Sequence, residues 1–108
     1  MISIPKAPVE LRNGYKDKEH LAKVGSLPCI ACQKLGIKQK FRTEVHHFIG
    51  MGIGKRASDL LTIPLCSIHH RKGNRGEAIH EGLKIWEEKF GTQRELLEEV
   101  KNLLDKQV

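Results

Sequence analysis

The sequence predicts a small α+β domain that is stabilised by a bound metal ion. The chain has 108 residues, which is the size of one domain, and a chain this short buries only a modest core. Two short segments in its middle have the character of strands, and its last third has helical periodicity. Its three cysteines are an odd number, which indicates metal or redox chemistry more than a disulfide framework.

The chain is expected to work in the cytoplasm, away from membranes. No apolar run approaches the roughly 18 residues of a membrane span. The segment Ile2–Val9 lacks the apolar region and cleavage site of a signal peptide.

Positive charge is concentrated in the first part of the chain. Residues 1–76 contain 14 Lys and Arg against 5 Asp and Glu, residues 77–108 contain 5 against 8, and the net charge is +6. This asymmetry suggests that the first part faces a polyanion and that the last part is scaffold. A merely basic soluble protein would account for the charge equally well.

Residues 1–16 are expected to form an irregular arm, and residues 17–108 a single domain. Asp17 has the character of an N-cap for a short helix in which Leu21 and Val24 share a face and which ends at Gly25. In chain order we then expect a basic loop over 34–42, a strand over 43–48, a glycine-rich loop over 50–54, a strand over 60–65 and a helix over 67–72.

Two helices are predicted within residues 81–106. Leu83, Trp86 and Phe90 recur at helical spacing, and Gly91 is suited to end that helix. Thr92, with Glu95 three residues later, forms the capping-box pattern of a second helix. The apolar stripe of this second helix, which we expect to be core, consists of Leu96, Leu97, Val100, Leu103 and Leu104.

Cys29-x-x-Cys32 and Cys66-x-x-His69 are spaced as two knuckles of a structural zinc site. Zinc accepts thiolate and imidazole ligands in a tetrahedron, and the two-residue spacing lets both side chains of a knuckle reach one ion. The alternatives are a redox pair or incidental buried cysteines. A redox pair needs only one Cys-x-x-Cys, in a βαβ setting that is absent here, and leaves Cys66 unexplained.

The remaining histidines near these knuckles suggest a second metal centre. Adjacent residues of a strand point to opposite faces, so His46 and His47 can serve different targets. Consecutive residues of a helix diverge by about 100°, so His69 can complete the zinc site while His70 faces the strands. A centre built from His46 and His70, with His47 beside it, follows from this arrangement.

Three segments together resemble the signature of the HNH (ββα-metal, His-Me finger) endonucleases. They are Glu44-Val-His-His-Phe48, Asp59-Leu-Leu-Thr-Ile-Pro-Leu-Cys66 and Cys66-Ser-Ile-His-His-Arg-Lys72. The likeness is strongest to the phage recombination-enhancing, Ref-like branch, to which Leu27-Pro-Cys-Ile-Ala-Cys32 and Ile79-His-Glu-Gly82, followed by Trp86 and Phe90, are also similar. The resemblance covers roughly residues 18–92.

This resemblance implies a ββα-metal core with flanking helices and a role for each matching residue. His47 matches the general base, His46 and His70 match ligands of the catalytic cation, and His80 matches a further ligand. Cys29, Cys32, Cys66 and His69 match structural zinc ligands. No Asn stands between His47 and Cys66. Asp59 is the nearest counterpart of that position, either as a metal ligand or as the residue that orients His47.

The implied activity is hydrolysis of DNA phosphodiester bonds to a 5′-phosphate and a 3′-hydroxyl. A divalent cation neutralises the phosphate, and an imidazole with a pKa near 6.5 can accept a proton from water at physiological pH. We expect magnesium in the cell; zinc, manganese or nickel also suit imidazole ligands. The Ref-like branch further implies a phage or prophage protein that acts on DNA held in a RecA-type recombinase filament.

Basic residues that cluster in sequence around this centre are candidates for phosphate contacts. They are Lys34, Lys38, Lys40, Arg42, Lys55, Arg56, Arg71, Lys72 and Arg75.

Two other functions remain open from the residues alone. One is a non-catalytic zinc module that binds DNA or a protein partner, which would have no use for His46, His47 and His70 together. The other is a metal-dependent RNase, because phosphodiester chemistry does not by itself discriminate sugars. The sequence does not indicate an oligomeric state.

Overall fold

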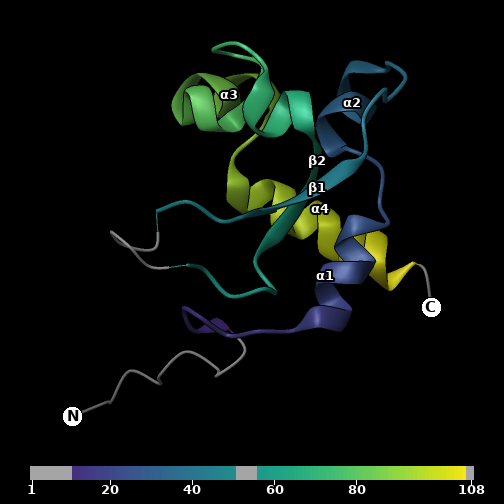
Figure 1. Cartoon of the computed structure of the whole chain (residues 1–108), viewed down its shortest axis with the longest axis vertical. Coiled ribbons are helices and arrows are strands. Elements are labelled where there is room, and N and C mark those ends of the chain that lie inside the picture. Colours follow the sequence, from purple (N-terminus) through teal and green to yellow (C-terminus); the bar gives the residue numbers. More distant parts are fainter. Residues whose placement is uncertain (1–10, 51–55, 107–108) are drawn as a thin grey trace.

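The structure, a computed structural model, describes residues 11–50 and 56–106. A two-stranded antiparallel sheet, β1 (Thr43–His47) and β2 (Thr62–Cys66), lies at its centre and is surrounded by helices (Figure 1). The predicted α+β class is therefore confirmed. Both strands were predicted, although β2 begins two residues later than expected and β1 ends one residue earlier.

The register of the hairpin places the two adjacent histidines on opposite faces of the sheet. His46 pairs with Ile63 and His47 with Thr62, and directly paired residues of antiparallel strands point to the same side. His46 is fully buried, whereas the side chain of His47 is 17% exposed. The predicted divergence of His46 and His47 is confirmed.

The first helix, α1 (Lys18–Gly25), begins where the sequence predicts. Its N-cap is Asp17, whose side chain accepts a hydrogen bond from the backbone N–H of His20 at 3.0 Å.

The helix α2 (Ile30–Leu35) was not predicted, so the expected loop over 34–42 was wrong at its start. Cys29 is the N-cap of α2, and its Sγ accepts a hydrogen bond from the N–H of Cys32 at 3.4 Å. Gly36 ends the helix at a φ of +66°, a conformation that glycine adopts without strain. A helix of six residues is too short to show an apolar period, and the knuckle itself forms its first turn.

The described part of the expected arm is hydrogen-bonded to the segment that precedes β2. The N–H of Gly14 donates to the carbonyl of Arg56 at 2.8 Å, and the N–H of Asp59 donates to the carbonyl of Tyr15 at 2.9 Å. Asp17 adds a bond from its N–H to the Asp59 carboxylate at 2.8 Å. Residues 14–17 therefore pack as part of the domain.

The helix expected over 67–72 is a single π-helical turn, η2 (Ile68–Lys72). The N–H of Gly73 donates to the carbonyl of Ile68 at 3.0 Å, which is the i→i+5 bond of a π-helix. A Cβ on Gly73 would lie 2.5 Å from that carbonyl oxygen, so only glycine fits there without a shift of the backbone. A 3₁₀ turn, η3 (Ile79–Glu81), follows.

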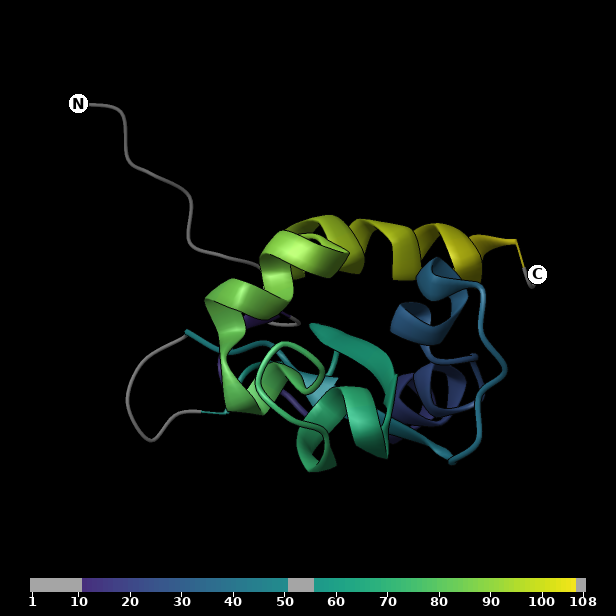
Figure 2. The ribbon, with the colours of Figure 1, turned by 90° about the horizontal axis from the view of Figure 1, so that it is seen from above.

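The two predicted C-terminal helices are α3 (Leu83–Phe90) and α4 (Gln93–Asp105). Gly91 ends α3 at a φ of +108°, and the capping box of Thr92 and Glu95 is present. Figure 2 shows α4 running along one side of the molecule, past the hairpin, to α1 and α2.

The core is built from residues of α1, α2, β2, α3 and α4, and its largest fully buried side chains include Trp86, Ile63, Leu65 and Leu96. Most of the predicted apolar stripe of α4 packs into this core, but Leu103 is 38% exposed and was wrongly assigned to it. Among the described residues, no helix combines the length and hydropathy that are needed to cross a membrane.

Candidate functional site

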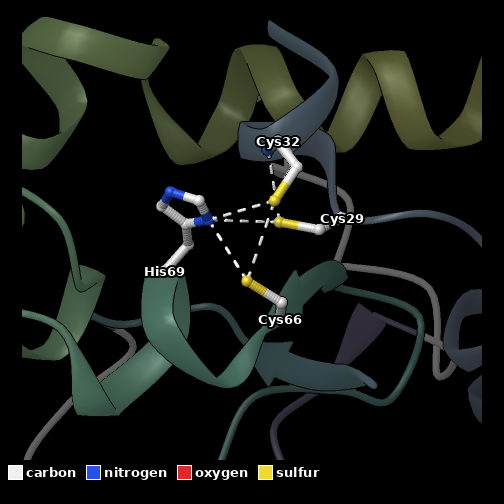
Figure 3. Close-up of side chains that lie close together, drawn as sticks. All are labelled: Cys29, Cys32, Cys66 and His69. Carbon is white, nitrogen blue, oxygen red and sulfur yellow. Dashed lines mark hydrogen bonds between the residues drawn. The ribbon is translucent and has the colours of Figure 1, made fainter. Parts of the chain in front are cut away.

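Four buried side chains from three elements converge at one end of the hairpin (Figure 3). Cys29 and Cys32 come from the start of α2, Cys66 is the last residue of β2, and His69 lies in η2. The Nδ1 atom of His69 lies 3.6, 3.5 and 3.2 Å from the Sγ atoms of Cys29, Cys32 and Cys66. The Sγ atoms of Cys32 and Cys66 lie 3.9 Å apart.

These distances fit four ligands of one tetrahedral zinc ion. Zinc–sulfur bonds of about 2.3 Å and zinc–nitrogen bonds of about 2.05 Å at tetrahedral angles require separations of about 3.8 Å between sulfurs and about 3.6 Å between sulfur and nitrogen. All three cysteines are free of disulfides. The Cys29, Cys32, Cys66 and His69 cluster could therefore hold a structural metal ion such as zinc, and it comprises the four residues that the sequence singled out.

The chemistry of this donor set also favours a cation. Burial raises the pKa of the Cys29 thiol, and burial together with the neighbouring cysteines raises the pKa of Cys32 to about 12. Burial lowers the pKa of His69. Neutral imidazole is the form that binds metal, and thiolates this close together need a positive ion to be stable.

The surroundings hold the cluster in place from two sides. The ring of His69 packs edge-on against Phe90 of α3, with ring centroids 5.6 Å apart. Gln39 accepts a hydrogen bond from the N–H of Cys29 at 2.7 Å and donates to Thr43 at the start of β1 at 2.9 Å. The knuckle is thus tied both to the helical part of the core and to the hairpin.

A second cluster consists of His46 from β1, His70 from η2 and His80 from η3. One ligand atom of each lies within 4.8 Å of the others, and the Nε2 atoms of His70 and His80 are 3.1 Å apart. Two nitrogens bound at right angles to one ion, each at about 2.1 Å, would be separated by about 3.0 Å. The structure brings these three predicted residues close enough together to bind one cation.

His46 is oriented by a residue that sequence reasoning missed. Its Nε2 lies 3.0 Å from the side-chain oxygen of Gln93, the first residue of α4. Its Nδ1 is buried and has no hydrogen-bond partner. Burial lowers the pKa of His46 to about 4, so the ring is neutral at physiological pH. Gln93 lies 47 positions from His46 in the sequence, and no local pattern connects the two.

His70 is oriented by a carboxylate. Its Nδ1 lies 2.9 Å from Oε1 of Glu44, and Arg71 donates to both oxygens of that carboxylate at 3.0 and 2.8 Å. The Arg71 guanidinium, with a smaller contribution from His70, holds the pKa of Glu44 below its usual value. Because Nδ1 of His70 is bonded to the ionised carboxylate of Glu44, Nε2 is the ring nitrogen that faces His80. Metal-binding histidines of metalloproteins are commonly held by a carboxylate in this way.

His47 lies on the other face of the sheet and contacts Asp59. Its Nε2 is 2.8 Å from Oδ1 of Asp59 and 3.2 Å from Nε of Arg56. This nitrogen cannot both donate to Asp59 and accept from Arg56. Because the buried carboxylate is closer and can only accept, Nε2 carries the proton and Nδ1 has the lone pair.

Asp59 lies with His47 and apart from the group of His46, His70 and His80. Burial would raise the pKa of Asp59, but hydrogen bonds from His47 and the Asp17 N–H, together with the charge of Arg56, outweigh it and lower the pKa. Of the two roles that the sequence left open for Asp59, the geometry favours orientation of His47.

The predicted basic residues are not all free to contact phosphate. Lys34 pairs with Glu99 of α4 at 3.0 Å, Arg71 pairs with Glu44, and Lys55 lies outside the described residues. The other six are exposed: Lys38, Lys40, Arg42, Arg56, Lys72 and Arg75.

The remaining histidine, His20, belongs to neither cluster. It lines a groove of about 760 Å³ together with apolar residues that include Leu61, Leu97 and Leu104. Burial lowers the pKa of His20. His20 therefore offers a reference histidine outside both clusters.

Comparison with known proteins assigns the chain to a family. The family described as "Protein of unknown function (DUF968)" matches residues 3–107. The chain belongs to this family. It is also 30% identical over 89 residues to the "Uncharacterized protein YdfU" of Escherichia coli (strain K12), an alignment that covers 80% of this chain and 22% of that protein. The chain thus spans about a fifth of the length of this relative. No solved structure matches the chain.

Proposed function

We propose that this DUF968 domain is a metal-dependent endonuclease of the HNH type that hydrolyses DNA phosphodiester bonds, with His47 as the general base. The observation that carries the proposal is that one hairpin has two histidine sites with different surroundings, one on each face. His46 meets His70 and His80 on one face, while His47 is held by Asp59 on the other. A zinc module that only binds partners has no need for this second set.

Each residue has a distinct part in the proposed reaction. A divalent cation bound by His46, His70 and His80 would neutralise the scissile phosphate and stabilise the leaving 3′-oxygen. Nδ1 of His47 accepts a proton from the attacking water, whose oxygen forms the new bond to phosphorus as the bond to the 3′-oxygen breaks. The Asp59 carboxylate stabilises the imidazolium that results, and the 3′-oxygen takes its proton from solvent.

The donor set also bears on the identity of the cation. Three imidazoles suit zinc, manganese or nickel better than magnesium, which prefers oxygen ligands. Magnesium remains the expected cellular ion only if phosphate oxygens and water complete its shell. The rate of DNA cleavage, measured with each of the four ions in turn, shows which ion supports the reaction best.

The proposed substrate is DNA in the bacterial cytoplasm, with a RecA-type filament as a candidate partner. Exposed Lys38, Lys40, Arg42, Lys72 and Arg75 support a polyanionic substrate, because such residues supply sequence-independent affinity for phosphates. The salt dependence of DNA binding tests whether the substrate is a polyanion. A comparison of binding to naked DNA and to filament-bound DNA tests whether the filament is a partner.

The decisive experiment is cleavage of supercoiled plasmid by purified protein with and without the His47→Ala substitution. Loss of the general base should reduce the rate about 100-fold or more, while the zinc content stays that of the wild type. Asp59→Asn should also reduce the rate, because an amide can donate its N–H to Nε2, which places the ring proton on Nδ1, the nitrogen that has to accept the proton of water. His20→Ala is the matched control and should cleave at the wild-type rate.

The same assay separates the alternatives. DNA binding without cleavage under any of the four ions would support the non-catalytic zinc module. Cleavage of an RNA strand, but not of the DNA of the same sequence, would identify an RNase. Equal cleavage by wild type and His47→Ala would contradict the proposed mechanism.

A further inference from the structure

Gln93 occupies a buried position between His46 and the backbone that follows β1. Its side chain is 3% exposed. Its Oε1 accepts a hydrogen bond from the N–H of Ile49 at 2.9 Å, and its Nε2 donates to the carbonyl of Ile49 at 3.0 Å. Because a backbone N–H can only donate and a carbonyl can only accept, these two bonds determine which end of the amide is oxygen.

The orientation of this amide determines the tautomer of His46. Oε1 of Gln93 lies 3.0 Å from Nε2 of His46, and an amide oxygen can only accept. Nε2 must therefore carry the proton, and the neutral ring has its lone pair on Nδ1. That Nδ1 atom is buried without a hydrogen-bond partner, on a ring whose centroid lies 5.2 Å from those of both His70 and His80.

We propose that Gln93 is a positioning residue that locks His46 in the Nε2–H tautomer, so that Nδ1 of His46 is prepared as a ligand of the second cation. The inference deepens the proposed function and rests on its second metal site. It assigns to α4 a part in metal binding that its sequence position does not suggest, since the ligands come from β1, η2 and η3.

The start of α4 is itself held firmly, as a positioning role requires. The N–H of Gln93 donates to Oε2 of Glu87 in α3 at 2.8 Å, and the capping box of Thr92 and Glu95 fixes the first turn. The side chain of Gln93 then bridges to Ile49, two residues beyond the end of β1. Gln93 thus fixes the His46 ring of β1 relative to the N-terminus of α4.

Substitution of Gln93 by Met tests the inference, since Met has a similar shape and no hydrogen-bonding amide. Gln93→Glu keeps an acceptor for His46 and for the Ile49 N–H. Glu87→Gln is the matched control, because it perturbs the same helix start without touching His46. Each variant is prepared as the full chain with zinc in the cysteine cluster, and its circular dichroism, melting temperature and zinc content verify folding.

Two measurements test the role of Gln93 without relying on DNA cleavage. The ¹⁵N chemical shifts of the His46 ring, recorded without added cation, report which nitrogen carries the proton. Titration with Ni²⁺, followed by calorimetry, reports the affinity of the second site. We expect His46 to be the Nε2–H tautomer in the wild type, in Glu87→Gln and in Gln93→Glu, and a mixture of both tautomers in Gln93→Met. The affinity for Ni²⁺ should fall about 10- to 100-fold in Gln93→Met alone.

The inference is overturned by a wild-type His46 with its proton on Nδ1, or by a folded Gln93→Met protein whose tautomer and Ni²⁺ affinity match the wild type. A wild type that binds no Ni²⁺ at the second site overturns it together with the proposed metal centre. The expected tautomers and affinities without DNA cleavage would support the role of Gln93 and would contradict only the nuclease proposal.

Discussion

Replacement of Cys32 by Ser tests whether the four-ligand cluster holds the domain together. Serine has nearly the same shape but is a poor zinc ligand. The cluster joins α2, β2 and η2 through Cys29, Cys32, Cys66 and His69, so its loss releases three elements at once.

The expected size of this effect follows from two free energies. At about 0.05–0.15 kcal/mol per residue, a domain of this length has a net stability of about 5–16 kcal/mol. Structural zinc sites of this kind contribute about 10–16 kcal/mol at neutral pH. A zinc ion bound here would therefore contribute as much free energy as the whole net stability, and we expect Cys32→Ser to be largely unfolded at 25 °C.

Zinc content and Trp86 fluorescence together measure the result. Trp86 is the single tryptophan and is fully buried, so its emission should shift to longer wavelength in Cys32→Ser and in wild type treated with a chelator. The control is His80→Ala, which removes a residue of the other cluster and should retain one zinc ion and the native emission. A wild type that keeps its melting temperature after complete removal of zinc would refute the reasoning.

Three further predictions concern local structure and pH. Thr92→Ala removes the capping box of α4 and should lower the free energy of unfolding by about 1 kcal/mol, as measured by urea denaturation. Gly73→Ala places a Cβ 2.5 Å from the Ile68 carbonyl oxygen, so it should open the π-helical turn and weaken Ni²⁺ binding through His70. Gly25→Ala is the control, because its Cβ would meet nothing closer than a side-chain atom of Val45 at 3.7 Å and Gly25, like Gly73, does not have a positive φ. Folding lowers the pKa of His46 to about 4. Between about pH 6.5 and 4 the unfolded chain therefore binds a proton at His46 that the folded chain does not bind. The stability that depends on a neutral His46 is present above about pH 6.5 and is lost as the pH falls toward 4. Between pH 7 and 5.5 this loss should be about 1 kcal/mol, measured as the difference from His46→Gln with one equivalent of zinc, which fills the cysteine cluster alone; equal pH dependence of the two proteins would contradict it.

The sequence by itself was sufficient for those features that depend on short stretches of chain. The caps at Asp17 and Thr92, the end of α3 at Gly91 and the ligand pairs Cys29–Cys32 and Cys66–His69 all involve residues within a few positions of each other. Hydrogen bonds along a helix and two-residue ligand spacings are local, so they can be inferred from a single chain. Alternation along a strand likewise predicted that His46 and His47 diverge.

Only the tertiary structure decided which residues orient the site. Gln93 reaches His46, Glu44 reaches His70 and Asp59 reaches His47 across 47, 26 and 12 positions. Such contacts depend on the register of the hairpin and on where α4 and η2 pack against it, which no local pattern encodes. The π-helical form of η2 and the pairing of Lys34 with Glu99 arise in the same way, since side-chain partners are chosen by packing after the elements have formed.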